Sequence, residues 1–456
     1  MFALWATVWP AAVHAQSEAA VPSDAPAADA EAPKAITLEP RSLPNYDGRD
    51  EAPASAGTSL LWVPRILLAP LYFIAEFVVR RPLGLVVTSV EEQEIAGKVL
   101  RFFTFGPRNR YFLSPSATFD LGFRPNVGVY FGVEDAFTPN NELRINYAFG
   151  GIGWNLASIT DRFTWDDARW EFAVRARFFQ RPDGRYFGTG TRVRRSLDSQ
   201  YSMLASDTQV YVERKIGPAG RVRLHTDLRF RSFGEDVSDG PTVPEQVLQE
   251  MESLPAGYLD GYTIHLSGAE LVLDSRRERP ANSTGVQASA DFAFAYSLRD
   301  PAESMWVNYG LSVVGFWDVS GVNHIVSLAL NMRLANAVRG EVPFTELPVI
   351  SGNGPMSGFL GAFLTGPSAL SATLSYSWPI WIYLDGVAHV AVGNVFDERF
   401  NGFAFSKFRL STAIGIAAVS KRDHFFEFLV GFGTDTFEAG ATVDSVRLVI
   451  GARREF

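Results

Sequence analysis

The sequence contains no cysteine. This absence excludes a disulfide scaffold, a thiolate metal site and a cysteine nucleophile, and it is compatible with any redox compartment. Long basic runs are also missing, and 41 Lys and Arg stand against 50 Asp and Glu, so nothing indicates a nucleic-acid groove. A chain of 456 residues with 47% hydrophobic content is too long and too apolar to be a peptide or a disordered tail.

The chain is rich instead in aromatic residues and glycine, with 36 Phe, 14 Tyr, 10 Trp and 39 Gly. This composition is typical of strands with girdles of aromatic side chains. From about residue 111 to the end, apolar and polar residues alternate with a period of two, for example around Phe292, Phe294 and Leu328. One face of each predicted strand is therefore apolar, and the other face tolerates charge.

The length of these strands distinguishes a membrane barrel from a soluble β-sandwich, which shows the same alternation. About ten residues is what a tilted strand needs to cross a bilayer, and soluble strands are shorter. Because open edges cannot exist in hydrocarbon, the strands must close into a ring with apolar residues outward. The sequence therefore predicts an all-β fold, a 16-stranded antiparallel transmembrane β-barrel over residues 111–456, with an N-terminal amphipathic helix. The predicted strands are 111–121, 127–136, 142–152, 155–165, 169–179, 205–216, 221–233, 262–274, 285–297, 305–318, 324–336, 369–382, 386–396, 406–419, 424–432 and 444–456.

Three segments precede the predicted barrel. Residues 1–15 form an apolar run that closes with Val13-His14-Ala15, which indicates a cleaved signal peptide. Residues 16–57 consist largely of Ala, Pro, Glu, Asp and Ser and cannot bury enough apolar surface to fold, which indicates a disordered linker. The third segment, residues 58–110, contains the predicted helix.

The apolar stretch at residues 60–79 is long enough to raise the question of a membrane-spanning helix. Its prolines and the charges of Arg65 and Glu76 argue against a span, because ionised groups are costly in hydrocarbon. Arg65, Glu76 and Arg80 share one face of a helical wheel. We therefore expect an amphipathic helix at the periplasmic mouth of the barrel, and a core helix of a small domain is the alternative.

Two long loops lie on the outer side if the N-terminus is periplasmic. In the first, Thr242 and Glu245 have the spacing of a capping box that opens a short helix. The second, residues 337–368, is rich in glycine, and it either extends into water or folds into the lumen. The seventh predicted strand carries four arginines that could attract anions, although we favour a luminal ion-pair network. These are Arg221, Arg223, Arg229 and Arg231, and the expected partners are Glu171, Asp227 and Asp291.

Several short motifs follow one another over residues 110–456. They are Phe187-Gly188-Thr189-Gly190, Asp274-Ser275-Arg276 with Pro280 and Gly285, Gly354 with Met356-Ser357-Gly358-Phe359, Tyr376-Ser377-Trp378-Pro379, and Gly393-Asn394-Val395-Phe396-Asp397. The ordered set resembles the bacterial surface antigen family, the Bam/Tam-type outer-membrane assembly superfamily. The resemblance implies that Gly354 to Phe359 belong to loop six, between strands eleven and twelve of sixteen.

Two positions depart from the family pattern. The family has an arginine in loop six and its aspartate partner on strand thirteen, whereas this chain has Ser357 and Ala391 there. Losing one partner alone would leave a desolvated charge, so the joint absence is physically coherent. We therefore predict a loop that is tucked into the lumen and held by neutral hydrogen bonds rather than by an ion pair.

The segment upstream of the barrel departs from the family as well. Family members that receive clients carry POTRA modules, but only residues 16–110 separate the expected signal peptide from the first strand, and 16–57 are expected to be linker. The resemblance thus implies a POTRA-less branch. One hypothesis is that the amphipathic helix enters or caps the periplasmic mouth.

An enzyme is not expected. The sequence has no Gly-x-Ser-x-Gly elbow, Walker loop, His-Glu-x-x-His motif or calcium-loop spacing. His389 could serve an outer-membrane phospholipase only if it lay beside a serine on the lipid-facing wall, and we favour a histidine with a structural hydrogen bond. We expect no cofactor, no catalytic residue and no metal site.

By resemblance, we expect an outer-membrane barrel that acts in membrane assembly or protein insertion. A weak seam between residues 114–121 and 446–456 would accept client strands or lipid, and Phe456 would supply the chain's own assembly signal. Expected partners are outer-membrane lipid and client barrel or envelope proteins, not nucleic acid. The alternatives are a passive pore or lipid-organising barrel without insertase activity, and a structural or antigenic protein that binds an envelope partner through residues 16–57.

Overall fold

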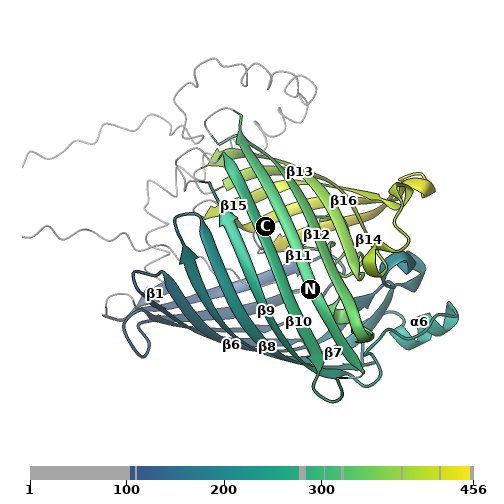
Figure 1. Cartoon of the computed structure of the whole chain (residues 1–456), viewed down its shortest axis with the longest axis horizontal. Helices are drawn as coiled ribbons and strands as arrows, with labels where there is room; N and C mark the ends of the chain where they lie inside the picture. The colour runs from purple at the N-terminus through teal and green to yellow at the C-terminus, as the bar shows by residue number, and fades with distance from the viewer. Residues whose placement is uncertain are drawn as a thin grey trace, which may run out of the picture.

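The structure is a computed structural model that describes residues 103–107, 110–276, 284–301, 303–319, 323–381, 384–420 and 423–451. Sixteen antiparallel strands, β2 to β17, form one sheet that closes on itself (Figure 1). This arrangement confirms the predicted sixteen-stranded barrel. The expected signal peptide, the linker and the amphipathic helix of residues 64–80 lie outside the described residues.

The strands follow one another around the barrel in chain order. They are β2 (Tyr111–Asp120), β3 (Asn126–Glu134), β4 (Asn141–Phe149), β5 (Asn155–Trp165), β6 (Trp170–Tyr186), β7 (Ser199–Ile216), β8 (Gly220–Gly234), β9 (Tyr262–Asp274), β10 (Gly285–Ser297), β11 (Ser304–Asp318), β12 (Ile325–Gly340), β13 (Ser368–Trp381), β14 (Leu384–Phe396), β15 (Arg409–Ser420), β16 (Asp423–Thr436) and β17 (Val443–Gly451). A short strand, β1 (Thr104–Phe105), pairs with the start of β2.

The largest differences from the predicted strands occur in β6 and β7. Strand β6 continues to Tyr186 and β7 begins at Ser199, so this hairpin is longer than the alternation indicated. The extra part of β6 contains Pro182-Asp183-Gly184, a turn-like sequence that interrupts the period of two. The ladder crosses it with a register shift between Arg181 and Gly184, which is why the pattern alone missed the extension.

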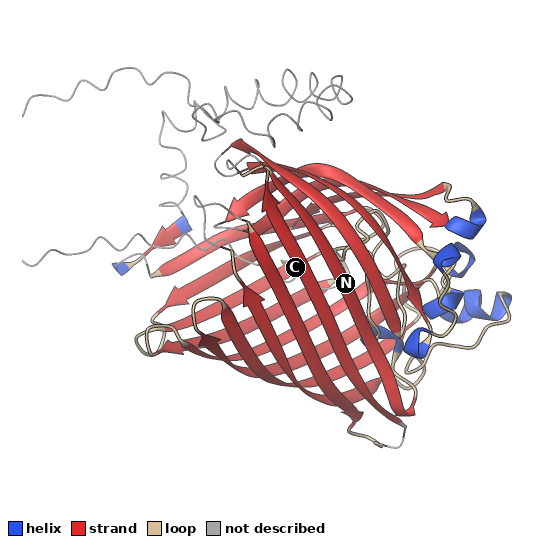
Figure 2. Ribbon diagram, turned by 45° about the horizontal axis from the view of Figure 1, so that its top comes forward, coloured by secondary structure: helices blue, strands red, loops and turns tan. Residues whose placement is uncertain are grey.

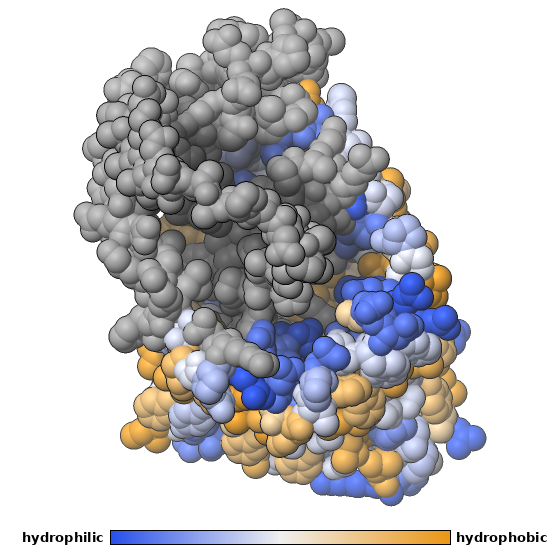
Figure 3. Space-filling view, turned by 90° about the vertical axis from the view of Figure 1, so that its left-hand side faces the viewer, coloured by the Kyte–Doolittle hydropathy of each residue, from blue (hydrophilic) through white to orange (hydrophobic). Residues whose placement is uncertain are grey.

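The apolar face of the strands points away from the lumen. Phe292, Phe294 and Leu328 expose 53%, 36% and 52% of their surface, whereas Ala293 and Ala329, their neighbours along the chain, are buried. Figure 3 looks at the end of the barrel that lies on the left in Figure 1. It shows hydrophobic side chains along the rim of the wall and hydrophilic ones nearer the middle. An exposed apolar outer face with a polar interior is the arrangement of a barrel in lipid.

The two ends of the barrel differ in their connections. Seven helical turns of the described chain gather at one end, where the long loops lie, and short helical pieces at Phe103 and Pro107 flank β1 at the other end (Figure 2). The seven turns are η3 (Gly190–Arg192), η4 (Arg195–Leu197), α6 (Val243–Gln249), η5 (Phe344–Glu346), η6 (Glu398–Phe400), η7 (Phe405–Lys407) and η8 (Phe437–Ala439). None of the helices within the described ranges has the length and apolar character that a bilayer span requires.

Helix α6 begins with the predicted capping box. Glu245 N–H donates to Thr242 Oγ1, and the Glu245 carboxylate accepts the backbone N–H of Thr242 at 2.9 Å. This backbone hydrogen bond, together with the bond to the Thr242 side chain, holds the pKa of Glu245 below its usual value. The sequence therefore specified this loop helix locally.

Candidate functional site

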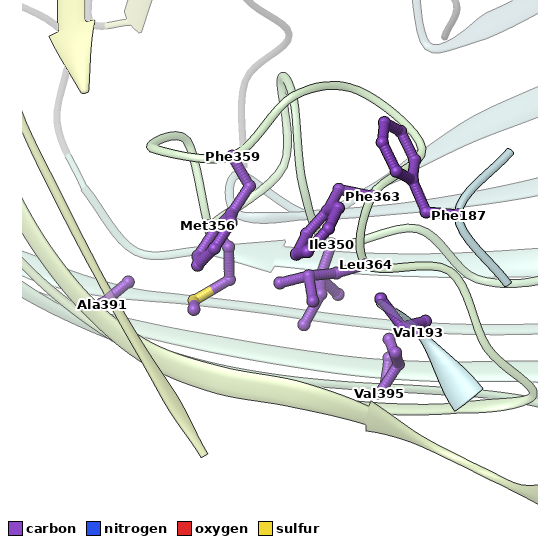
Figure 4. Packing of buried hydrophobic residues seen from close by; sticks show 10 residues of the cluster. Phe187, Val193, Ile350, Met356, Phe359, Phe363, Leu364, Ala391 and Val395 are labelled. Atoms are coloured by element: carbon purple, nitrogen blue, oxygen red, sulfur yellow. The ribbon is translucent and has the colours of Figure 1, made fainter. Parts of the chain in front are cut away.

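Loop six (residues 341–367) folds into the lumen rather than into water. Met356 and Phe359 are 0% exposed and belong to a hydrophobic cluster that includes Ala391 of β14 (Figure 4). Val390, the neighbour of Ala391, is 46% exposed on the opposite face of the same strand. The cluster therefore lies on the luminal face, and the predicted tucked loop is confirmed.

The tip of loop six contacts β16 backbone to backbone. A Cβ atom at Gly358 would lie 2.2 Å from the carbonyl oxygen of Phe432, and one at Gly431 would lie 2.8 Å from the Cα of Gly358. The Gly358 N–H also donates to Ser411 Oγ of β15 at 2.8 Å. Glycine is needed at position 358 because any side chain would push the tip away from the wall.

The Phe187-Gly190 motif packs against the same loop. The rings of Phe187 and Phe363 meet edge to face with centroids 5.1 Å apart, and Gly190 N–H donates to the Thr365 carbonyl at 2.9 Å. On the other side, the guanidinium of Arg195 lies 5.0 Å from the Phe363 ring centroid. Two motifs that are distant in the sequence thus form one packing unit.

The strand motif at Gly393 and Asn394 lies on β14, beside this unit. A Cβ at Gly393 would lie 2.8 Å from the carbonyl oxygen of Leu370, so glycine allows close approach of β13. Asn394 Nδ2 donates to the Lys407 carbonyl at 2.6 Å. These two residues hold β14 against β13 and the turn that contains Lys407.

The two positions where the family has its ion pair carry no charge here, and both are buried. Ser357 is 5% exposed and Ala391 is 1% exposed. Ala391 belongs to the same apolar cluster as Met356, which points toward β14 (Figure 4). Between loop six and β14, apolar packing of Met356 and Ala391 replaces the ion pair that the family resemblance implied.

A charge reaches loop six from another strand, however. Arg447 of β17 forms a buried ion pair with Asp120 of β2, with Nε to Oδ1 at 3.0 Å and Nη2 to Oδ2 at 2.8 Å. The same guanidinium donates to the carbonyls of Gly352 at 2.5 Å and Ser357 at 3.3 Å, and to Asn353 Oδ1 at 2.9 Å. The prediction that the loop would be held by neutral groups alone is therefore wrong.

Sequence reasoning missed Arg447 and Asp120 as site residues. Each is a charged residue at an inward position of a terminal strand, next to outward residues such as Leu121 and Val446, which are 44% and 53% exposed. That alternation could have indicated luminal charges. It could not have paired them, because their contact depends on how the first and last strands meet.

The seam between β2 and β17 has a short ladder within the described residues. Only Val449 with Asp120 and Ile450 with Phe119 are in register, and Leu121 N–H donates to the Leu448 carbonyl at 3.1 Å. By contrast, the β16–β17 ladder runs from Glu427 to Thr434 along β16. The terminal residues 452–456, with Phe456, lie outside the described part of the chain.

The Asp274-Ser275-Arg276 motif lies at the opposite end of the barrel from loop six. Arg276 pairs with Asp274 at 2.9 Å, and its guanidinium lies 4.0 Å from the ring centroid of Phe316. A Cβ at Gly285 would lie 2.9 Å from Ser275 Oγ, so this glycine allows β9 and β10 to approach closely. Pro280 is among the residues that the structure leaves undescribed.

The luminal wall of β4 to β9 carries the predicted ion-pair network, with partly different partners. Arg223 pairs with Glu213 at 2.6 Å, Arg229 pairs with Asp227 at 2.7 Å, and Arg231 pairs with Asp207 at 2.5 Å. Two of the expected partners bind other arginines: Asp291 lies 3.3 Å from Arg333, and Glu171 lies 3.6 Å from Arg162. Arg221 forms no ion pair with any residue in the described part of the chain.

The histidine arrangement excludes the phospholipase geometry considered for His389. His389 Nδ1 lies 2.8 Å from Ser375 Oγ, and the two residues are opposite each other in the β13–β14 register. His389 is 8% exposed and lies on the same face of β14 as Ala391, which is the luminal face rather than the lipid-facing one. In the described ranges, no three His, Asp or Glu side chains are grouped as a metal site.

The residues of the expected mouth helix, Arg65, Glu76 and Arg80, lie outside the described residues. Their proposed place at the periplasmic mouth therefore stays a prediction. The described site consists of loop six, the seam strands and the luminal faces of β13 to β17.

Comparison with known proteins supports the fold. No protein-family model matches the sequence, and neither does any curated protein. Among solved structures, BamA from Haemophilus ducreyi lacking POTRA domains 1–3 matches with a TM-score of 0.54 and 10% identity, over 75% of this chain and 70% of that chain.

Two CdiB structures match with a TM-score of 0.45, which is too low to support the fold further. The protein from Acinetobacter baumannii is 11% identical over 75% of this chain and 59% of that chain. The protein from Escherichia coli is 10% identical over 74% of this chain and 62% of that chain. The chain thus has the sixteen-stranded barrel fold of the BamA structure, as its ordered motifs predicted.

Proposed function

We propose that this chain is an outer-membrane β-barrel that assists the assembly of membrane proteins at the seam between β2 and β17. The observation that carries the proposal is that the first and last strands of the ring meet at this seam, with register pairs at Val449–Asp120 and Ile450–Phe119 in the described residues. The apolar outer face supports the membrane location, because side chains such as Phe292 and Leu328 need lipid around them.

The seam is the natural place for the wall to open, because β2 and β17 are the first and last strands of the ring and no turn connects them. Each backbone hydrogen bond contributes a net ~0.5–1.5 kcal/mol, and opening the seam breaks one ladder without moving a hairpin turn. An opened seam presents two strand edges whose N–H and C=O groups can pair with an incoming strand. A client strand or a lipid would enter there from within the membrane.

Loop six supports this role by steadying the wall beside the seam. Gly354 to Phe359 lie in the lumen, and the Gly358 tip lies against the backbone of β16, next to β17. Loop six would hold the last strands in place while the seam is closed. Phe456 as an assembly signal, and the residue 58–110 segment as a cap of the mouth, stay predictions of the same proposal.

Reconstitution in proteoliposomes tests the proposal. A urea-unfolded eight-stranded outer-membrane barrel is added to liposomes with or without this protein, and its folding is followed by electrophoretic mobility. We expect faster folding with the protein present. A folding rate equal to that of empty liposomes would refute the assembly role.

A passive pore or lipid-organising barrel is the second candidate. The observation that favours it is the charged luminal wall, where Arg223, Arg229 and Arg231 each pair with a carboxylate. A paired polar wall suits water and small ions, and it needs no client. Steady conductance in planar bilayers, together with no effect on client folding, would favour this candidate over the first.

A further inference from the structure

We propose that Arg447 couples loop six to the seam, so that the seam between β2 and β17 opens only when the tip of loop six leaves the luminal wall. We name Arg447, Asp120 and the three loop acceptors on Gly352, Asn353 and Ser357 the Arg447 clasp. The coupling is a property of the barrel itself. Its consequence for client entry rests on the proposed function.

The geometry of the clasp joins three parts of the chain through one side chain. Arg447 Nε and Nη2 donate to the two carboxylate oxygens of Asp120 on β2, and Nη1 donates to the carbonyls of Gly352 and Ser357. Nη2 also donates to Asn353 Oδ1. All three guanidinium nitrogens therefore donate hydrogen bonds. Arg447 divides these donors between Asp120 and the acceptors of loop six.

The local packing leaves room for this arrangement. Arg447 is paired in the β16–β17 register with Gly431, the glycine whose Cβ would lie 2.8 Å from Gly358 Cα. The lack of a side chain at Gly431 lets loop six approach the wall beside Arg447. Gly431 thus leaves space both for the loop tip and for the Arg447 guanidinium that holds it.

Burial makes the contacts of the clasp depend on one another. The side chains of Arg447 and Asp120 are 2% and 5% exposed, so neither charge reaches water while the loop covers them. If the seam opened under a docked loop, Arg447 would be left buried with only neutral acceptors, which is strongly unfavourable. If the loop lifted first, water would reach the pair, and the cost of separating it would fall.

The clasp brings a charge from β17 to neutral acceptors in loop six. A charged donor reaches the Ser357 carbonyl from the last strand. Its carboxylate partner lies on the first strand rather than on β14. The ion pair therefore spans the seam itself, and in this chain loop docking and seam closure share one residue.

Cysteine chemistry can test the coupling without background, because the chain has no cysteine of its own. Phe119→Cys and Ile450→Cys form the test pair, because these residues are opposite each other in the seam register. Oxidation locks the seam, and reduction frees it. Proteinase K cleavage within residues 350–364 of the full-length protein in detergent micelles reports whether loop six has left the wall.

Coupling between two sites is reciprocal, so locking the seam should hold the loop. We expect oxidation to slow loop cleavage at least tenfold in the parent, and we expect Arg447→Met to remove that effect. Arg223→Met is the matched control, because Arg223 pairs with Glu213 and Glu270 on other strands. It should keep the full protection.

The proposal is overturned if oxidation leaves loop cleavage unchanged in the parent, or if it protects the Arg447→Met variant equally. Heat-modifiable mobility confirms that each variant is folded, and Arg447→Lys replaces Arg447→Met in the same assay if the latter does not fold. Failure of client folding in proteoliposomes, with the cleavage coupling intact, would remove the assembly role and leave the clasp.

Discussion

Asp120→Asn removes one charge from the buried pair while keeping the size of the side chain. The Arg447 guanidinium, in a side chain that is 2% exposed, would then be buried without its carboxylate. Removing one partner of a buried ion pair costs about 3–5 kcal/mol, which corresponds to roughly a hundredfold to several-thousandfold change in the unfolding equilibrium. The carbonyls of Gly352 and Ser357 do not offset this cost, because they are neutral.

Urea unfolding in detergent micelles measures the effect, with tryptophan fluorescence and heat-modifiable mobility as readouts. We expect a lower urea midpoint for Asp120→Asn. Asp260→Asn makes the same chemical change at an exposed residue of the loop between β8 and β9 and should leave the midpoint unchanged. Adding Arg447→Gln to Asp120→Asn should recover part of the loss, because no lone charge remains. Equal midpoints for Asp120→Asn and Asp260→Asn would refute the reasoning.

Three further predictions concern other parts of the barrel. Gly358→Ala should displace the loop tip and speed proteinase K cleavage of loop six, whereas Gly315→Ala, where a Cβ meets nothing within 4 Å, should not; equal rates would contradict the tight contact. Arg231→Met should lower the urea midpoint by an amount that reflects about 1.5–3 kcal/mol, because Asp207 loses one charged hydrogen-bond partner and keeps Arg177, and an unchanged midpoint would show that the pair adds nothing. Nuclear magnetic resonance should give a pKa for Glu245 below its usual value. The Glu245 carboxylate then stabilises the α6 cap fully above the usual pKa of a glutamate, and this stabilisation is lost as the pH falls through the lowered pKa. Glu245→Gln should remove this pH dependence. An ordinary pKa for Glu245 would contradict the prediction.

Most of the barrel could be predicted because its strands obey a local rule. Alternation of apolar and polar residues marks a strand wherever one face meets lipid, and strands such as β5 and β9 begin and end where the pattern indicated. The extension of β6 through Pro182-Asp183-Gly184 could not be read in this way. There the ladder continues by tertiary pairing although the local sequence favours a turn.

The site was only partly predictable, for a related reason. The glycines of loop six and the missing charges at Ser357 and Ala391 are visible in the sequence, and they indicated a loop packed in the lumen. The Arg447–Asp120 pair joins residues that are 327 positions apart. Their contact follows from closure of the whole ring, which no local pattern contains.

The most direct test of the account is client folding in proteoliposomes that contain the Phe119→Cys/Ile450→Cys variant. With the seam cysteines reduced, a urea-unfolded eight-stranded barrel should fold faster than in empty liposomes. Oxidation should return the rate to the empty-liposome value, and reductant should restore it. A rate that is the same with the seam disulfide open or closed would contradict the claim that membrane proteins assemble at this seam.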